Sequence, residues 1–480
     1  MLNRIFYLFS LALILSWMAA SGCRKPLSFS TDHLEFSQDT VLFDTVFTTI
    51  GSTTQRFKLY NRENKTVKIE GIQLMGGTDS PFRINVDGVP GTDFGEIELE
   101  SRDSLFVFVE VTLDPNGGIL PLVVEDSIRF RTNGVDQYVN LVVWGQDAYF
   151  HYNEVLDLDV SPVWPNDKPH VIYGFAVVKE GETLTIPSGT TVHLHKNSFL
   201  FVYKGALNIA GTLTEPVTFC GDRLEPSYDD VSGQYYGIYL QEALPSTINY
   251  CNIKNATAGI HIYSENSANT DYTVKLTNST ITNCARYGIF LFTDSLKNNP
   301  RLAAENSIIS KNAFHSLFVL GGGEYRINHC HLLGYSSEGQ SPALGLSNHY
   351  TNQDGITWVM DINEASITNS VVYGYLDQEY AFDTLNPGGS TVLNYDFQSN
   401  LIRSKDVPTD AFFTSGVANI WNQNPGFRDI GEGDFFYWAS SPLTESGNSA
   451  FPNQLFNSTA IDIRGITRQP PFDIGAYEIE

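Results

Sequence analysis

A repeated four-residue pattern between residues 250 and 402 most constrains how this chain folds. In each copy a small or polar residue precedes an apolar residue that closes the segment, and the closing residues are Ile253, Ile281, Ile309, Leu332, Val372 and Ile402. Successive closing residues are 28, 28, 23, 40 and 30 positions apart. A β-forming unit that recurs every roughly 22 to 30 residues, with occasional longer insertions, is typical of a solenoid whose coils stack.

The segments beside these copies support stacked β-coils. Second candidate strands, Gly259–Tyr263 and Gly288–Phe292, follow the first strands at 253 and 281. Asparagine tolerates left-handed backbone geometry at tight corners, and stacked amides can bond from coil to coil. We therefore predict a structural role for the asparagines at these corners, which are Asn255, Asn278, Asn283, Asn306, Asn312 and Asn369.

The segments at both ends of this region resemble known proteins. Thr183–Val192, Gly205–Leu213 and Pro216–Phe219 resemble the opening coils of right-handed parallel β-helix proteins. Asp462–Gly465 and Asp473–Glu478 are similar to the closing segment of bacterial surface β-helix proteins of the choice-of-anchor kind. The resemblance implies an all-β fold, with a right-handed parallel β-helix over residues 166–480.

The region before the repeats, residues 23–148, predicts a different β architecture. Short alternating segments separated by turn residues indicate about seven strands, which fits a β-sandwich. The six clearest are 34–36, 55–59, 67–69, 104–111, 127–130 and 138–143. The order of features, from Leu59–Asn61 to Val142–Gly145, resembles immunoglobulin-like domains that flank bacterial surface proteins. We expect this domain to be a spacer, with a linker at 149–165.

The first 23 residues predict export and lipid attachment. Arg4 precedes the apolar run Ile5–Trp17, which is shorter than the roughly 20 residues that span a bilayer, and small residues follow it. Residues 1–22 are therefore predicted to be a signal peptide. Ala20–Cys23 resembles the lipobox of bacterial lipoproteins, which implies lipidation of Cys23 and attachment to a membrane. Arg24 in place of aspartate favours the outer membrane in the enterobacterial sorting pattern, while the side that the protein faces stays open.

The remaining cysteines and the charge limit the other possibilities. If Cys251 and Cys330 stack with two coils between them, about 14 Å separates them. A disulfide requires Cα atoms within about 7 Å, so this pair is predicted to stay reduced. The chain has 29 Lys and Arg against 54 Asp and Glu, a net charge of -25, which disfavours nucleic acid as a partner.

The strongest candidate for ligand binding lies in an acidic segment predicted to be a loop between coils. Asp229 and Asp230 precede Tyr235, Tyr236 and Tyr239. Carboxylates are suited to calcium, and tyrosine rings are suited to stacking on sugar rings. A solvated loop is the simpler interpretation, and we expect no other cofactor.

Two histidine pairs are weaker candidates for a metal site. His329 and His331 share one strand face, as do His193 and His195. Metal sites in proteins use three or four protein ligands, and no further ligand lies near either pair in the sequence. We therefore predict no metal site there.

Two functional classes remain open. The first is a cell-envelope binding protein whose β-helix face, or insertions such as 333–361, contacts a polysaccharide or a surface protein. The second is a polysaccharide lyase or a glycoside hydrolase on the same scaffold, for which the candidate bases are Arg286, Arg301 and Lys311 and the candidate acids Asp361, Asp377 and Asp383. The binding protein is favoured, because no motif ties these acids and bases together.

Overall fold

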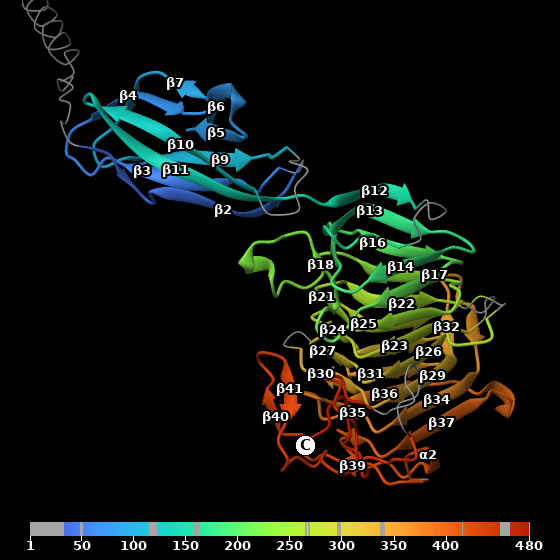
Figure 1. Cartoon of the computed structure of the whole chain (residues 1–480). Coiled ribbons are helices and arrows are strands. Elements are labelled where there is room, and N and C mark those ends of the chain that lie inside the picture. The colour runs from blue at the N-terminus through green and yellow to red at the C-terminus, as the bar shows by residue number, and fades with distance from the viewer. Residues whose placement is uncertain are drawn as a thin grey trace, which may run out of the picture. The chain divides into compact units, whose positions relative to one another are not determined.

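The structure is a computed structural model that describes residues 33–48, 51–114, 122–156, 163–264, 266, 269–294, 299–336, 341–414, 416–451 and 461–479. Nearly all of its regular structure is β-strand (Figure 1). The chain divides into two compact units between Gln146 and Asp147. None of the helices among the described residues has the length and apolarity needed to span a membrane. Cys23 and the predicted signal peptide lie outside the described residues.

The first unit is a sandwich of two β-sheets. One sheet has the strand order β1 (Glu35–Phe36), β3 (Gln55–Tyr60), β9 (Ser104–Val111), β5 (Phe82–Val86) and β6 (Val89–Gly91). The other has the order β2 (Thr40–Phe47), β11 (Val135–Gln146), β10 (Leu122–Thr132), β4 (Val67–Leu74) and β7 (Asp93–Phe94), with β8 (Ile97–Leu99) also paired to β4. Alternate side chains of both sheets fill one apolar core, which includes Phe57, Phe82 and Phe130. The predicted sandwich is therefore confirmed, and its immunoglobulin-like character stays a prediction.

The second unit begins earlier than the sequence predicted. The sequence suggested a linker at 149–165, but β12 (Tyr149–Val155) pairs in parallel with β13 (His170–Val178), the first long strand of the β-helix. The ring of Trp164 stacks on His170, with ring centroids 4.1 Å apart. These residues therefore belong to the β-helix.

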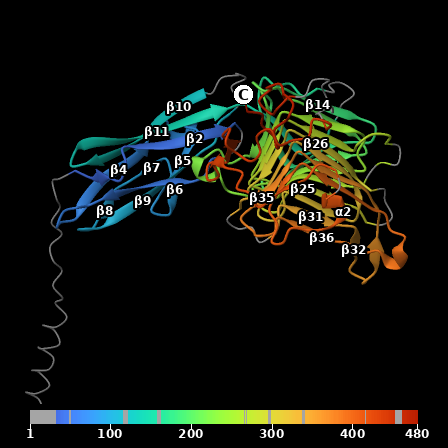
Figure 2. The same ribbon diagram turned by 90° about the horizontal axis from the view of Figure 1, so that it is seen from below.

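The β-helix is right-handed and parallel, and each coil contributes a strand to each of three faces. We call them face 1, face 2 and face 3; in Figure 2 the labels β35, β31 and β26 mark them on three sides of the β-helix. After β13, face 1 contains β15 (Thr191–Leu194), β18 (Val217–Gly221), β21 (Cys251–Lys254), β24 (Thr280–Thr282), β27 (Ile308–Ser310), β30 (His331–Gly334), β35 (Val371–Gly374), β38 (Leu401–Ile402) and β39 (Ile420–Trp421). Face 2 contains β16 (Phe199–Tyr203), β19 (Gly237–Gln241), β22 (Ala258–Tyr263), β25 (Tyr287–Phe292), β28 (Leu317–Leu320), β31 (Leu344–Ser347) and β36 (Tyr380–Asp383). Face 3 contains β14 (Thr183–Pro187), β17 (Ala206–Ala210), β20 (Ser246–Asn249), β23 (Val274–Thr277), β26 (Arg301–Glu305), β29 (Gly323–Asn328), β34 (Ile362–Thr368) and β37 (Leu393–Gln398).

The two units also contain short elements outside the main sheets. They are the hairpin of β32 (His349–Thr351) and β33 (Thr357–Val359), the hairpin of β40 (Phe427–Asp429) and β41 (Asp434–Tyr437), the helix α2 (Ala411–Thr414), and the 3-10 turns η1 (Gly77–Asp79) in the sandwich, η2 (Pro226–Tyr228) and η3 (Pro387–Gly389).

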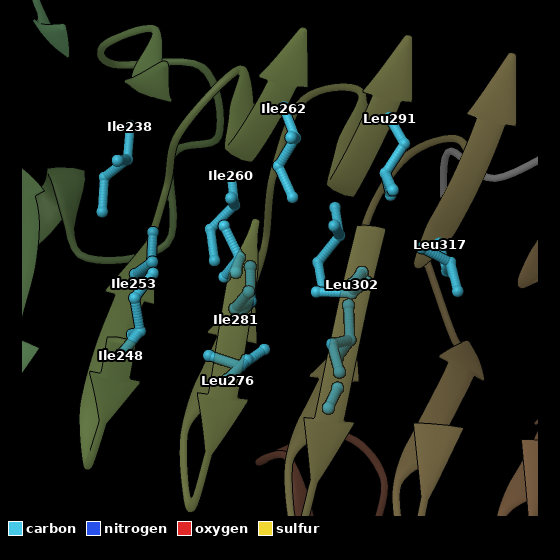
Figure 3. Packing of buried hydrophobic residues seen from close by; sticks show 14 of the residues in the cluster. Ile238, Ile248, Ile253, Ile260, Ile262, Leu276, Ile281, Leu291, Leu302 and Leu317 are labelled. Carbon is cyan, nitrogen blue, oxygen red and sulfur yellow. The ribbon is translucent and has the colours of Figure 1, made fainter. Parts of the chain in front are cut away.

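The strand register confirms the sequence repeat. Ile253 pairs with Ile281, Ile281 with Ile309, and Ile309 with Leu332. Leu332 then pairs with Val372, and Val372 with Ile402, across the longest insertion. These residues stack in the core with apolar side chains of the other two faces, such as Ile260 and Leu276 (Figure 3). The repeat therefore arises because each coil must add one apolar side chain to the same core column.

The predicted corner asparagines are structural. Left-handed φ angles of 67°, 50°, 56°, 48° and 46° occur at Asn255, Asn278, Asn283, Asn306 and Asn369. Their amides bond between coils: Asn283 Nδ2 donates to Asn255 Oδ1 over 2.8 Å, and Asn306 Nδ2 donates to Asn278 Oδ1 over 3.2 Å. At Asn312 the left-handed residue is the preceding Lys311, and Asn312 Oδ1 accepts from the Cys284 backbone N–H instead.

The cysteines of the β-helix are free, as predicted for Cys251 and Cys330. Ser279 and Ser307 occupy the coils between these two. The backbone N–H of Cys251 donates to Ser279 Oγ over 3.0 Å, and that of Ser279 donates to Ser307 Oγ over 3.2 Å. The column is therefore a buried hydrogen-bonded ladder in which cysteine and serine serve as small residues.

The C-terminal segment covers the outer side of face 1. An apolar cluster joins this segment to outward side chains of β27, β30, β35 and β38, such as Val371; the segment contributes Phe435, Tyr437, Leu443 and Ile474.

The guanidinium of Arg468 is fully buried inside this layer. Its Nη1 lies 3.2 Å from Glu478 Oε2, and its Nη2 donates to Asn306 Oδ1 over 3.0 Å and to the Gly475 carbonyl over 2.8 Å. One buried cation therefore joins the closing segment to a corner of the β-helix.

Candidate functional site

Face 2 presents a column of aromatic side chains on its outer side. Alternate residues of each strand point into the core, and the intervening positions of five consecutive strands are occupied, in register, by Phe201, Tyr239, His261, Phe290 and Phe318. We call these five residues the aromatic column. His261 is 8% exposed and the other four are half-buried. The register of the β-helix therefore gathers rings from residues more than 100 positions apart.

The rings of the column stack on one another. Adjacent ring centroids, from Phe201 to Phe318, are 5.1, 4.7, 4.7 and 5.5 Å apart, with interplanar angles of 14°, 23°, 31° and 8°. These distances match the spacing of parallel strands, about 4.8 Å. Each ring therefore covers the face of its neighbour. At the end of the column the ring of His315 stacks on Phe318, with ring centroids 4.6 Å apart and an interplanar angle of 21°.

The column carries no charge at neutral pH. The hydroxyl of Tyr236 lies 2.6 Å from His261 Nδ1, and burial lowers the pKa of His261 to about 4. Burial also raises the pKa of Tyr239 to about 12. Both residues are therefore neutral, and the column attracts ligands through dispersion and apolar contact.

A pocket of about 230 Å³ opens where the column ends. In the next two coils of face 2 the register continues with Gly345 and Ala381, which carry no large side chain. A Cβ atom at Gly345 would lie 2.9 Å from Phe318 Cδ2 and 3.0 Å from His315 Cε1. Glycine at this position therefore lets both rings approach the backbone, and Ala381 leaves the floor beyond it open.

The pocket has few polar groups. His349 Nε2 lies 3.2 Å from Asp383 Oδ1, and the side chain of Asp383 is 77% exposed. His315 Nδ1 lies 2.6 Å from the Pro342 carbonyl, and burial lowers the pKa of His315. Among the described residues that line the pocket, Asp383 is the one carboxylate, and none is a lysine or an arginine.

One wall of the pocket is the hairpin of β32 and β33, which lies in the insertion that the sequence singled out at 333–361. Tyr350 of β32 lines the pocket, and its ring meets Phe292 edge-on, with centroids 5.0 Å apart. Cross-strand pairing of Tyr350 with Trp358 holds the hairpin together. The insertion therefore contributes a wall as well as the floor residue Gly345.

The structure separates the five residues predicted to bind a ligand. Tyr239 belongs to the aromatic column, and Tyr236 lies beside it, with ring centroids 6.2 Å apart. Tyr235 is 1% exposed and its hydroxyl donates to the Phe219 carbonyl inside the core, so it is not available to a ligand.

The two predicted aspartates lie in the loop between β18 and β19. The carboxylates of Asp229 and Asp230 are exposed, and the backbone carbonyls of these residues accept hydrogen bonds from Asn255 and Asn283. Neither aspartate lines the pocket. Among the described residues, no three His, Cys, Asp or Glu side chains gather in a group that could hold a metal ion. Calcium binding by this loop stays a prediction.

The histidine pairs serve the fold. His331 is buried beneath the C-terminal segment, where burial lowers its pKa to about 3, and His329 packs edge-on against Phe472. His193 Nδ1 lies 2.9 Å from the Gly221 carbonyl, and His195 Nδ1 lies 2.7 Å from Asp222 Oδ2.

The acids and bases suggested for an enzyme have separate partners. Asp361 Oδ1 accepts from the Val392 backbone N–H, Asp377 lies 3.3 Å from Arg403, and Asp383 lies in the pocket. The candidate bases Arg301 and Lys311 donate to the carbonyls of Asn269 and Gly431, and Arg286 is exposed near Tyr236. Of all these residues, Asp383 alone lines the pocket.

Sequence reasoning missed the pocket because its residues follow no local motif. The available signal was the alternation of aromatic residues in the second strands, such as Phe290 and Phe292. This signal is interrupted at Gly345, where only the coil register shows that an aromatic residue is missing.

Comparisons with known proteins support the fold and leave the function open. Residues 220–332 match the family described as the right handed beta helix region. This segment contains the column from Tyr239 to Phe318. A search for curated proteins of similar sequence found no match.

Two solved structures show weak similarity. One is a family 123 glycoside hydrolase from Clostridium perfringens, described in connection with glycolipid glycan hydrolysis, with 7% identity over 25% of this chain and 30% of that chain, and a TM-score of 0.18. The other is the ASH/PapD-like domain of human CEP192, with 16% identity over 26% of this chain and 94% of that chain, and a TM-score of 0.17. Neither similarity is strong enough to indicate a shared function.

Proposed function

We propose that this protein is a lipid-anchored protein of the bacterial cell envelope whose β-helix binds glycan chains. The observation that carries this proposal is the pocket at the end of the aromatic column, which combines the ring of Phe318 with the polar groups of His349 and Asp383. Ligand sites are commonly apolar and aromatic surfaces with a few polar groups that fix orientation. A sugar ring fits such a site, because its C–H face packs on an aromatic ring while its hydroxyls need hydrogen-bond partners.

A binding role is favoured over catalysis by what lines the pocket. Glycoside hydrolases generally use two carboxyl groups about 5 to 9.5 Å apart, and the described lining residues include one carboxylate, Asp383. A lyase acting on uronates needs cationic groups near the sugar carboxylate, and no lysine or arginine lines the described pocket. The pair of His349 and Asp383 has the geometry of a base beside an orienting acid, so product formation should be assayed alongside binding.

Glycan retention tests this function directly. We expect the full chain to be retained on an array of envelope and plant polysaccharides, and Phe318→Ala to weaken the affinity about tenfold, the loss expected for one aromatic contact of about 1.4 kcal/mol. Affinity electrophoresis on the retained polysaccharide measures the change. The matched control is Phe314→Ala, because Phe314 is exposed near the same face but does not line the pocket. Absence of retention by the unmodified chain, or release of shortened products, would contradict a binding role.

Membrane attachment through Cys23 has a separate test. We expect Cys23→Ser to abolish the incorporation of radiolabelled palmitate and to release the protein from the membrane fraction, because a serine hydroxyl cannot form the thioether that carries the lipid. The control is Cys220→Ser, since Cys220 belongs to the β-helix. Palmitate incorporation that persists in Cys23→Ser would rule out this anchor. Sucrose-gradient separation of the two membranes then tests the predicted outer-membrane location.

A further inference from the structure

The aromatic column stops before face 2 does. β31 and β36 continue the face for two coils beyond Phe318, with Gly345 and Ala381 at the register of the column. Two coils correspond to about 10 Å along the β-helix axis. A Cβ at Gly345 would lie 2.9 and 3.0 Å from the rings of Phe318 and His315, so these two rings occupy the space above Gly345. The open part of the pocket therefore begins beyond them, over Ala381.

The dimensions of this gap suit one ring. The pocket volume of about 230 Å³ is below the roughly 300 to 1,000 Å³ of pockets that enclose drug-sized ligands. Neighbouring rings in the column are 4.7 to 5.5 Å apart, and the coil of Ala381, beyond the rings of Phe318 and His315, adds about 4.8 Å along the axis. A six-membered ring can therefore continue the stack.

The walls of the gap favour a sugar over an aromatic side chain. Asp383 is largely exposed and can accept hydrogen bonds from hydroxyl groups. An aromatic hydrocarbon ring would leave this carboxylate without new partners. A pyranose offers both a C–H face for Phe318 and hydroxyls for Asp383.

Charge restricts the class of sugar further. Asp383 is the one carboxylate among the described lining residues, and Asp294 accepts from the Tyr263 hydroxyl elsewhere on the same face. A uronate or a sulfated sugar would place a second negative charge near Asp383, where no lysine or arginine lies among the described lining residues, and the chain carries a net charge of -25. Uncharged sugars avoid this repulsion.

We infer that one neutral pyranose unit of a glycan chain packs against the rings of Phe318 and His315 at the end of the aromatic column and lies over Ala381. This inference rests on the proposed glycan binding and names its ligand class. The sugar ring extends the aromatic surface over Ala381, and its hydroxyls bond to Asp383 and to His349.

The inference is tested by filling the pocket with a side chain of the protein itself. Ala381 is exposed and already carries a Cβ, so Ala381→Phe fills the gap without disturbing the buried core. We expect this variant to bind neutral hexasaccharides at least tenfold more weakly than the unmodified protein. The matched control is Ala450→Phe, an exposed alanine outside the pocket, which should change the affinity less than twofold.

Isothermal titration of the full chain with hexasaccharides of β-1,4-linked glucose, mannose and xylose, and with hexagalacturonate, gives these affinities. We expect at least one neutral hexasaccharide to bind tenfold or more tightly than hexagalacturonate at low salt. Asp383→Asn should reduce the ratio between the affinities for the neutral hexasaccharide and for hexagalacturonate. Because Asp383 is 77% exposed, the variant should keep the melting temperature of the unmodified protein.

The outcomes separate the two proposals. If a neutral hexasaccharide binds and Ala381→Phe leaves its affinity unchanged, the filled-gap inference is wrong while glycan binding stands. If hexagalacturonate binds more tightly than every neutral hexasaccharide, the inference that the sugar is neutral is wrong, while glycan binding again stands. If the unmodified protein binds no glycan, the proposed function itself fails.

Discussion

Replacing Arg468 with methionine is expected to lower the free energy of unfolding by about 3 to 5 kcal/mol. The Arg468 guanidinium is fully buried and lies against Glu478, while it donates to Asn306 and to the Gly475 carbonyl. Methionine fills a similar volume but leaves Glu478 and the fully buried Asp462 without this cation. Removing one partner from a buried ion pair is costly because the remaining charge stays away from water. Urea denaturation followed by intrinsic fluorescence measures the change.

The control for this prediction is an arginine of the same segment that reaches water. Arg428 lies 3.4 Å from Asp434, and both side chains are about 40% exposed. Exposed ion pairs contribute about 0 to 1 kcal/mol, so Arg428→Met should lower the free energy of unfolding by less than about 1 kcal/mol. Equal losses in the two variants would mean that the buried network does not hold the C-terminal segment in place.

The sequence predicted the β-helix well because its core obeys a local rule. Each coil needs one apolar residue at the position of Ile253 or Ile281, and in these two coils an asparagine in left-handed geometry, such as Asn255, follows at the corner. Both requirements fall on nearby residues, so the pattern is visible without knowledge of the fold. The register even holds across the insertion between Leu332 and Val372, because a core column tolerates no shift.

The candidate site could not be predicted in the same way because it depends on what adjacent coils place side by side. The acidic loop attracted attention as a cluster along the sequence, yet Tyr235 points into the core while Tyr236 lies on the aromatic face. Although the two tyrosines are adjacent in the sequence, one is buried in the core and the other lies on the outer surface. The pocket itself is marked by an absence, the small residues Gly345 and Ala381 at the register of Phe318. A missing side chain leaves no motif to recognise.

The C-terminal segment could be predicted from the sequence only in part. Its sequence resembles known closing segments, and the pattern around Asp462 and Asp473 is visible in the chain. The sequence does not show where this segment attaches to the β-helix, because Arg468 bonds to Asn306, a residue 162 positions away. Asn306 therefore serves two purposes, since its amide also donates to Asn278 in the corner ladder.

Glu379 is expected to make the stability of the β-helix depend on pH. Its carboxylate is fully buried, and its two oxygens accept from the backbone N–H groups of Ala343 and Leu376 over 2.9 and 2.8 Å. A Cβ at Gly334 or Gly374 would lie within 2.3 Å of these oxygens, so the glycines make room for the carboxyl group. Burial raises the pKa of Glu379 from 4.5 to about 7.

The direction of the effect follows from this raised pKa. Between about pH 4.5 and pH 7 the folded protein holds a proton on Glu379 that the unfolded chain releases, so stability falls as the pH rises through this window and then levels off. A difference of about two units or more corresponds to about 3 kcal/mol. Urea denaturation at pH 5, 6, 7 and 8 should show this loss in the unmodified protein.

Glu379→Gln isolates this contribution, because glutamine keeps the shape of the side chain and does not titrate. Other groups that titrate in the same window contribute equally to both proteins, so the difference between their stability curves reports Glu379 alone. We expect Glu379→Gln to be the less stable protein at pH 5, since its NH2 group must face one of the two backbone donors, and to approach or exceed the unmodified protein at pH 8. Glu180→Gln, at an exposed position, should reproduce the unmodified pH profile. Parallel curves for Glu379→Gln and the unmodified protein would show that Glu379 stays charged in the folded state at pH 5, held by the hydrogen bonds from Ala343 and Leu376.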